Sequence, residues 1–141
     1  MFLLDTNVIS ELRKISLGRA NLNVAQWASQ VDPADLYISA ITVHELEVGI
    51  LRRERKDAVQ GAALRRWLRD RVLTTFAGRI LSVNTEVAMC AAQLQVPNPH
   101  PVQDGLIAAT ALVHDMTVVT RNISDFSNTR ASLLNPWQHK S

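Results

Sequence analysis

Hydrophobic and polar positions along the chain alternate between two spacings. Short apolar runs predict buried strands at Phe2–Asp5, Leu36–Ser39, Arg79–Val83, Thr117–Thr120 and Ser132–Leu134. Between them, apolar residues recur at helical spacing and predict helices at Thr6–Lys14, Val24–Val31, Ile41–Arg55, Ala58–Phe76, Glu86–Leu94 and Gly105–His114. Strands that alternate with helices favour a mainly parallel sheet covered on both faces. The predicted fold class is therefore α/β, with a three-layer α/β/α architecture.

Composition narrows this picture to an ordinary globular chain. The 141 residues, 47% of them hydrophobic, predict a single domain over residues 1–141. Pro97–Pro101 forms a stiff linker that cannot be helical. No apolar stretch reaches membrane-spanning length, and the first residues lack the features of a signal peptide. Cys90 is the only cysteine, so no internal disulfide can form, and a cytoplasmic chain is the simplest expectation.

Charge is distributed unevenly along the chain. The segment from Arg52 to Arg79 holds nine basic and three acidic residues, whereas the formal net charge of the whole chain is only +2. A basic segment beside an acidic remainder is typical of proteins that bind a polyanion. Two solvated helix faces would give the same pattern, and the charges alone do not decide between these readings.

Several acids fall where a parallel sheet would bring them together. Asp5 ends the first predicted strand, Glu45 lies early in the helix after the second, and Asp104 opens the helix after the proline linker. Asn122 and then Asp125 follow the strand that ends at Thr120. Carboxylates gathered at one sheet edge repel unless cations lie between them, and Mg²⁺ and Mn²⁺ prefer such oxygen ligands. The pattern therefore predicts metal-assisted hydrolysis of a phosphodiester, with one or two metal ions.

Each acid also has a structural explanation. Asp5 could cap the following helix, and Asp104 could complement a helix dipole. Glu45 could be an ordinary solvated residue, with Glu47 as its rival; two helix steps rotate by about 200°, so both cannot face one site. The polar residues after Thr120 would suit an Asx turn. Only their joint placement after separate strands favours a catalytic site.

Other catalytic schemes fit poorly. His44-Glu45 begins like a zinc-protease helix, but Val48 stands where the second histidine must be. The four histidines form no ligand spacing, and the five glycines form neither a Walker loop nor a dinucleotide-binding pattern. No Gly-x-Ser-x-Gly elbow is present.

The chain resembles PIN-domain ribonucleases of the VapC toxin family, in particular its FitB-like members. The resemblance rests on segments that span the chain in family order: Leu4–Glu11 (LDTNVISE), Ile38–Leu46 (ISAITVHEL), Phe76–Leu81 (FAGRIL), Asp104–Ala111 (DGLIAATA), Thr117–Asn122 (TVVTRN) and Asn135–Trp137 (NPW). It implies an α/β/α sandwich and a Mg²⁺- or Mn²⁺-dependent endoribonuclease that a small antitoxin neutralises.

The resemblance also implies roles for single residues. Asp5, Glu45 and Asp104 match the principal catalytic acids of the family, with Asp5 and Asp104 as metal ligands. The fourth acid stays open, since FitB-like chains can have Asp where this chain has Asn122, and many VapC chains have an acid where Asp125 stands.

Four further residues are candidates for supporting or substrate contacts. Thr6, Asn7 and Thr120 are expected to hydrogen-bond to the acids, and Arg121, together with the basic helices, to hold the RNA backbone. Asn122 belongs with this group if Asp125 is the fourth acid. The short, proline-rich approach to Asp104 departs from the longer, glycine-containing approach common in the family, which leaves the shape of that loop open.

The resulting hypothesis is the toxin of a type II toxin–antitoxin module, with transfer or ribosomal RNA as candidate substrates. The alternative is a nuclease-weak partner of a DNA-binding antitoxin that acts in operon autoregulation, with DNA contacted only through the antitoxin. A homodimer without membrane contact is also expected. Besides the resemblance, the dimer is suggested by the apolar residues of the long helices: Val48, Leu51, Leu64, Trp67 and Leu68.

Overall fold

The computed structural model describes residues 1–140 and contains one five-stranded parallel sheet. Its strands are β1 (Phe2–Leu4), β2 (Leu36–Ser39), β3 (Ile80–Leu81), β4 (Thr117–Val119) and β5 (Leu133–Leu134). They lie in the order β3-β2-β1-β4-β5, and every neighbouring pair is parallel. All five predicted strands are confirmed, and each is as long as predicted or shorter.

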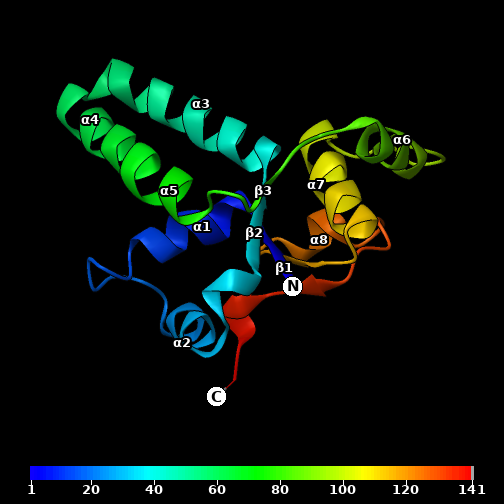
Figure 1. The fold of residues 1–141 in the computed structure, drawn as a ribbon, viewed down its shortest axis with the longest axis horizontal. Coiled ribbons are helices and arrows are strands. Elements are labelled where there is room, and N and C mark those ends of the chain that lie inside the picture. Colours follow the sequence, from blue (N-terminus) through cyan, green and yellow to red (C-terminus); the bar gives the residue numbers. More distant parts are fainter. Residues whose placement is uncertain (141) are drawn as a thin grey trace.

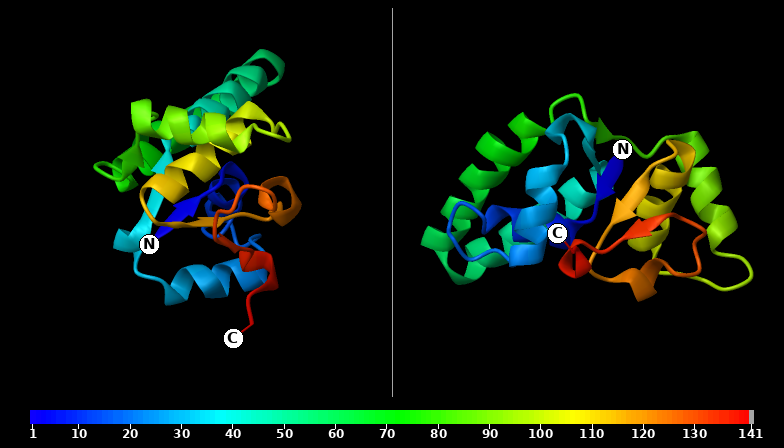
Figure 2. Two further views of the ribbon diagram at one scale, coloured as in Figure 1. Left: turned by 90° about the vertical axis from the view of Figure 1, so that its right-hand side faces the viewer. Right: turned by 90° about the horizontal axis from the view of Figure 1, so that it is seen from below.

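Helices cover both faces of this sheet (Figures 1 and 2). They are α1 (Thr6–Arg13), α2 (Leu22–Gln30), α3 (Ala40–Lys56), α4 (Ala58–Trp67), α5 (Leu73–Thr75), α6 (Thr85–Leu94), α7 (Val102–Val113) and α8 (Ile123–Phe126), with short 3-10 helices at Pro33–Asp35 and Pro136–Gln138. One hydrophobic core joins the sheet to α1–α4, and the second joins it to α6–α8. The predicted three-layer sandwich is confirmed.

The alternation of side chains along the central strands produces these two cores. In β1, Leu4 faces the first core and Leu3 the second; in β4, Val119 and Val118 divide in the same way. All four are fully buried. A strand that buries both faces reads as a continuous apolar run, which is why the sequence pattern located β1 and β4 well.

Two helices differ from their predicted bounds in ways that matter for the site. The predicted helix Ala58–Phe76 contains a π-helical turn at Leu68–Val72, which periodicity does not anticipate. Helix α7 begins at Val102, directly after Pro101, so Asp104 lies in its first turn instead of opening it. Helix α8 and the helix at Pro136–Gln138 were not predicted, because elements of three or four residues are too short to show a period.

The basic segment is less free than its composition suggests. Arg65 forms ion pairs with Glu47 and with Glu54, the latter at 3.1 Å. Arg79 donates hydrogen bonds to three backbone carbonyls, those of Pro33, Leu36 and Thr75. Part of the positive charge therefore holds the α3–α4 hairpin and the entry to β3 together, and only the remainder faces solvent.

The surplus of apolar residues on the long helices is also smaller than the sequence predicted. Leu68 is only 3% exposed and belongs to the first core, and Leu64 and Trp67 pack against that core. Leu51 remains about half exposed. Cys90 is half-buried and packs against the second core. Within residues 1–140, no helix is both long and apolar enough to cross a bilayer.

Candidate active site

The sheet presents its polar residues at one edge, where the carboxyl ends of the parallel strands meet. Asp5 follows β1, Thr120 follows β4, and Ser39 ends β2 and caps α3 by accepting a hydrogen bond from the Ile41 N–H at 3.0 Å. Helix α7 leads into β4, so its first turn lies at this same edge and carries Asp104 there. Ligand sites in open α/β sheets form at this edge.

Among the acids at this edge, Asp5 accepts the most hydrogen bonds. It is 6% exposed and accepts hydrogen bonds from the Thr6 N–H at 2.9 Å and the Thr120 hydroxyl at 2.8 Å. Burial raises the pKa of its carboxyl, and the hydrogen bonds from Thr120 and Thr6 oppose that rise. Asp5 is therefore both the cap of α1 and a buried carboxylate of fixed orientation, so the two roles weighed from the sequence coexist.

Asn7 connects Asp5 to the segment after β4. Its side-chain amide donates to Asp5 Oδ2 at 3.2 Å and contacts Thr120 Oγ1 at 3.4 Å, while its Oδ1 accepts the Arg121 N–H at 3.2 Å. The Asn122 N–H donates to Thr120 Oγ1 at 3.0 Å. These bonds bring residues from the two ends of the chain into one polar network.

Glu45 faces the same edge from α3. Burial raises the pKa of its carboxyl, and the charge of Asp5 raises it further, whereas the neighbouring Thr6 hydroxyl lowers it. Glu45 Oε1 and Thr6 Oγ1 are both buried, yet neither has a well-aligned hydrogen-bond partner among residues 1–140. Glu47 points elsewhere, to its ion pair with Arg65, so Glu45 is the glutamate of this helix that lies among the acids.

Asp104 and Asp125 complete the acidic surface. The pKa of Asp104 is raised by burial and then by the charges of Asp5 and Asp125, while His100 lowers it. Asp125 lies on α8 and is exposed, and its charge also raises the pKa of Asp5. We call Asp5, Glu45, Asp104 and Asp125 the acid cluster.

The acid cluster is spread out in this structure. Among residues 1–140, no three His, Cys, Asp or Glu side chains stand close enough to share one metal ion as they are placed. The donor set is nevertheless the one that Mg²⁺ and Mn²⁺ use, namely carboxylate oxygens with hydroxyl and amide neighbours. The raised pKa values and the unpartnered Glu45 Oε1 are what a cation at this place would relieve.

The structure brings the predicted acids and their polar partners to this edge of the sheet, ties the Arg121 backbone to it, and adds neighbours that the sequence did not single out. His100, placed in the proline-rich linker, is close enough to lower the pKa of Asp104. Thr42, one turn before Glu45, is fully buried, and its hydroxyl has no hydrogen-bond partner within the described residues. Trp137 lies against Arg121, with the ring centroid 5.3 Å from the guanidinium carbon. Only the position of Thr42 relative to Glu45 could have been read from helical spacing.

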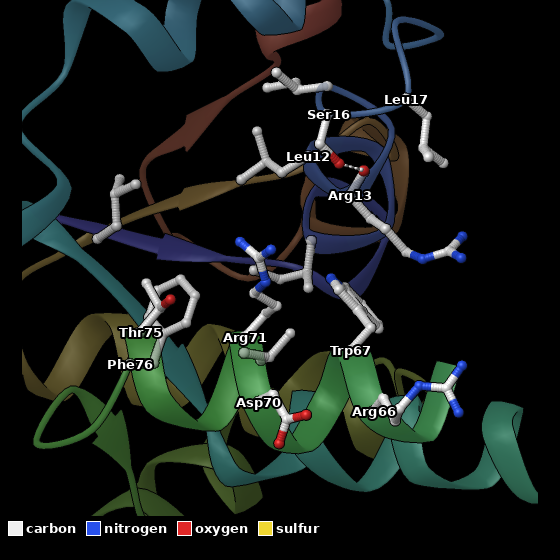
Figure 3. Close-up of a pocket in the computed structure, with 14 residues that line it drawn as sticks. Leu12, Arg13, Ser16, Leu17, Arg66, Trp67, Asp70, Arg71, Thr75 and Phe76 are labelled. Carbon is white, nitrogen blue, oxygen red and sulfur yellow. Dashed lines mark hydrogen bonds between the residues drawn. The ribbon is translucent and has the colours of Figure 1, made fainter. Parts of the chain in front are cut away.

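A second concave surface lies away from the acid cluster, between α1 and the helices α4 and α5 (Figure 3). This groove of about 660 Å³ has a mainly apolar lining, which includes Ile9, Leu12, Leu36, Trp67, Val72 and Phe76. Arg66 and Arg71 line it from the opposite wall to Leu17, and Ile15 is also part of the lining. None of its lining residues belongs to the acid cluster, so the two surfaces are separate features.

Comparison with known proteins agrees with this geometry. The family model of the PIN domain matches residues 2–131. The chain is 39% identical to Toxin FitB of Neisseria gonorrhoeae over 97% of this chain and 99% of the relative. It is 38% identical to a VapC ribonuclease of Sinorhizobium fredii over 98% of this chain and 99% of the relative.

Solved structures show the same likeness in three dimensions. The crystal structure of FitAcB from Neisseria gonorrhoeae matches with a TM-score of 0.88 at 36% identity, covering 98% of this chain and 99% of that chain. A toxin–antitoxin complex from Klebsiella pneumoniae matches with a TM-score of 0.65 at 25% identity, covering 96% and 98%.

Proposed function

The chain belongs to the PIN domain family, and from that premise we propose that it is the endoribonuclease toxin of a toxin–antitoxin pair. Its reaction is the hydrolysis of RNA phosphodiester bonds, and a cognate antitoxin neutralises it. The observation that carries the proposal is the acid cluster itself, in which the charge of Asp5 at the carboxyl edge of the sheet acts on Glu45 and Asp104. Near-complete coverage of relatives named toxin and ribonuclease supports it.

We propose that Asp5 and Asp104 hold Mg²⁺ or Mn²⁺. Both offer carboxylate oxygens at the sheet edge, and each raises its neighbours' pKa values through its charge. When bound, such an ion supplies Lewis-acid activation of water and neutralises charge on the phosphate. Thr120 and Thr6 orient the Asp5 carboxylate for this role through their hydrogen bonds.

Glu45 is the best candidate for the group that takes a proton. Its Oε1 is buried and unpartnered, and its raised pKa brings it closer to neutrality, where a general base is most effective. The neighbouring Thr6 hydroxyl opposes part of this rise in the pKa of Glu45. Arg121 and the exposed arginines of α3, Arg52, Arg53 and Arg55, would hold the RNA backbone against this acidic surface.

We propose Asp125 as the fourth acid, in preference to Asn122. The charge of Asp125 acts on both Asp5 and Asp104, so this carboxylate belongs to the same electrostatic unit. Asn122 supports the cluster differently, since its backbone N–H holds the Thr120 hydroxyl that orients Asp5.

The groove between α1 and α4 is the surface we assign to the antitoxin. Its apolar lining and three cations, Arg13, Arg66 and Arg71, against the single acid Asp70, fit an amphipathic segment that carries apolar side chains and acids. Charge-reversing substitutions, Arg66→Glu and Arg71→Glu, are expected to weaken the complex with the cognate antitoxin and to leave RNA cleavage by the free toxin unchanged.

A homodimer remains part of the proposal, supported by the family resemblance. Light scattering that gives a monomer mass at micromolar concentration would contradict it.

The test of the proposed function is RNA cleavage by the purified, antitoxin-free chain. Total RNA and separate transfer and ribosomal RNA fractions are incubated with Mg²⁺ or Mn²⁺, and the products are mapped. We expect cleavage at defined sites that requires the metal and is abolished in Asp104→Asn. A folded chain that cleaves none of these RNAs with either metal would contradict the assignment.

A further inference from the structure

Arg121 and Arg13 are the two arginines of residues 1–140 whose guanidinium lies over a tryptophan ring without a hydrogen-bonding partner, and Arg121 is the one whose backbone is tied to Asp5 through Asn7. Arg79 also lies over an aromatic ring, at 5.2 Å from Phe76, but it donates its N–H groups to three backbone carbonyls. Arg121 lies 5.3 Å over Trp137, is exposed, and within residues 1–140 its side chain forms neither a hydrogen bond nor an ion pair. The fork of donors therefore remains available to a ligand.

The backbone of Arg121 is fixed directly beside the acid cluster. Its N–H donates to Asn7 Oδ1, and Asn7 in turn donates to Asp5. On the other side, the Asn135 side chain donates to the Arg121 carbonyl at 3.4 Å. The guanidinium thus starts from a point tied to Asp5, and its charge lowers the pKa of Glu11 on the neighbouring helix α1.

Trp137 restricts the side-chain torsions of Arg121, and the structure holds the Trp137 backbone from two sides. Its N–H donates to Asn135 Oδ1 at 2.9 Å, and its carbonyl accepts from the Asn23 amide of α2 at 2.7 Å. The segment Asn135–Gln138 lies beside α2, where the C-terminal helix meets the first helical layer (Figures 1 and 2). The backbone that carries the indole is therefore held in place, in part by a contact between residues more than a hundred positions apart.

We infer that Trp137 is a positioning residue that holds the Arg121 guanidinium for an RNA phosphate next to the acid cluster; this inference rests on the proposed function. Stacking covers one face of the guanidinium and leaves its N–H edge free, which is the edge that pairs with phosphate oxygens. An unstacked arginine would have to lose its side-chain entropy on binding, whereas the stacked one has lost part of it in advance. Arg121 contacts RNA, and Trp137 acts through it.

A double-mutant cycle tests this inference. The dissociation constant of a fluorescein-labelled single-stranded RNA of mixed sequence is measured by anisotropy in Mg²⁺, with Asp104→Asn in every protein to prevent cleavage. Trp137→Ala is expected to weaken binding about two- to fivefold, the value of an exposed cation–π contact. In an Arg121→Ala background, the same change is expected to have almost no effect, because the residue it positions is gone.

Three controls separate positioning from general structural damage. Trp137→Phe retains a stacking face and is expected to restore binding to near the parent value. Arg121→Lys keeps the charge but loses the planar fork, so it should weaken binding about as much as Trp137→Ala. Arg19→Ala removes the same charge from an exposed loop and should leave RNA binding unchanged. In the cleavage-competent chain, Trp137→Ala should raise KM while kcat changes little.

Several outcomes would overturn the inference. Equal losses from Trp137→Ala with and without Arg121 would show that the indole acts independently, either as part of the fold or by stacking on a base. If Trp137→Ala fails to fold, the result with Arg121→Lys decides, since binding equal to the parent would rule out a need for the stacked fork. Absence of RNA binding by the Asp104→Asn parent, combined with no cleavage by the native chain, would contradict the proposed function instead.

Discussion

The acid cluster and the groove between α1 and α4 are both open to solvent, but their relations to stability are opposite. In the acid cluster, burial and like charges raise the pKa values of three carboxyls, and a buried oxygen of Glu45 has no hydrogen-bond partner among residues 1–140. In the groove, Ile9, Val72 and Phe76 are nearly buried residues of the first core. The acid cluster therefore lowers the free energy of unfolding, whereas the residues at the floor of the groove raise it because they form part of the first core.

This difference shows which of the two surfaces gives the stronger evidence for a function. A residue kept in spite of its cost to stability is a candidate for chemistry. A residue that lines a pocket and also fills the core is explained by packing alone, so the apolar character of the groove is weaker support for a function than the charge of the cluster. Substitutions in the acid cluster should therefore lower activity without lowering stability, whereas substitutions in the floor of the groove should lower stability without lowering the activity of the folded chain.

The largest expected effect is on catalysis in the acid cluster. Asp104→Asn should lower RNA cleavage by about 10²- to 10⁴-fold, the range for loss of a positioned acid or base group. Because the substitution removes a charge that Asp5 and Glu45 repel, the metal-free variant should melt at the same temperature as the parent or higher. Full cleavage by Asp104→Asn in Mg²⁺ would remove the basis for the site assignment.

The groove should show the reverse. Phe76→Ala removes a ring that is 6% exposed and should lower the free energy of unfolding by about 3–5 kcal/mol, as large-to-small changes in cores do. The fraction that stays folded should cleave RNA normally. Leu17→Ser serves as the matched variant, because Leu17 lines the same groove but is 48% exposed; it should leave urea unfolding almost unchanged. Equal destabilisation by the two variants would show that the groove is not divided into core and rim.

A smaller effect is expected from the fourth acid. Asp125→Asn should lower cleavage by about 10- to 100-fold, the usual cost of losing a group that supports a metal site. Asn122→Asp adds a carboxylate beside Thr120 and should change the rate by less than Asp125→Asn does. Rates measured at several Mn²⁺ concentrations separate the two variants. If Asn122→Ala abolishes cleavage and Asp125→Asn leaves it intact, the roles of these residues are exchanged.

The smallest expected effect is on the pH dependence of stability without metal. Folding raises the pKa values of Asp5, Glu45 and Asp104, so the folded chain binds protons more tightly than the unfolded chain. The contribution of these groups to the free energy of unfolding is therefore largest below their ordinary pKa values and decreases as pH rises through the raised ones. Urea unfolding in EDTA at a series of pH values should show this decrease.

Asp5→Asn provides the control for that measurement. Without the Asp5 charge, the pKa of Glu45 loses its second-largest cause of elevation, and the decrease in stability with pH should become shallower. Saturating Mg²⁺ should have a similar effect, since a bound cation favours the charged carboxylates. An identical pH profile in the native chain and in Asp5→Asn would show that the carboxyls are not coupled.

Much of this arrangement could be predicted from the sequence because it depends on local patterns. Continuous apolar runs identified β1 and β4, where both faces are buried, and the polar residue directly after each strand located Asp5 and Thr120. Helical spacing located α3 and thus placed Glu45 near the start of that helix, close to the end of β2. The parallel topology followed from the alternation of strands and helices, and it implied that Asp5, Glu45 and Asp104 would share one edge.

Only the tertiary structure decided which of several similar side chains are used in ion pairs and hydrogen bonds within the fold and which face the acid cluster or solvent. The sequence offers both Glu45 and Glu47, but only the packing of α4 on α3 places Arg65 where it pairs with Glu47 and leaves Glu45 to the cluster. It shows a row of arginines, but only long-range contacts commit Arg79 to backbone carbonyls and leave the Arg121 fork free. Local periodicity depends on neighbours within a few residues, whereas these pairings join residues far apart in the chain, and their energies exist only once the sheet has brought those segments together.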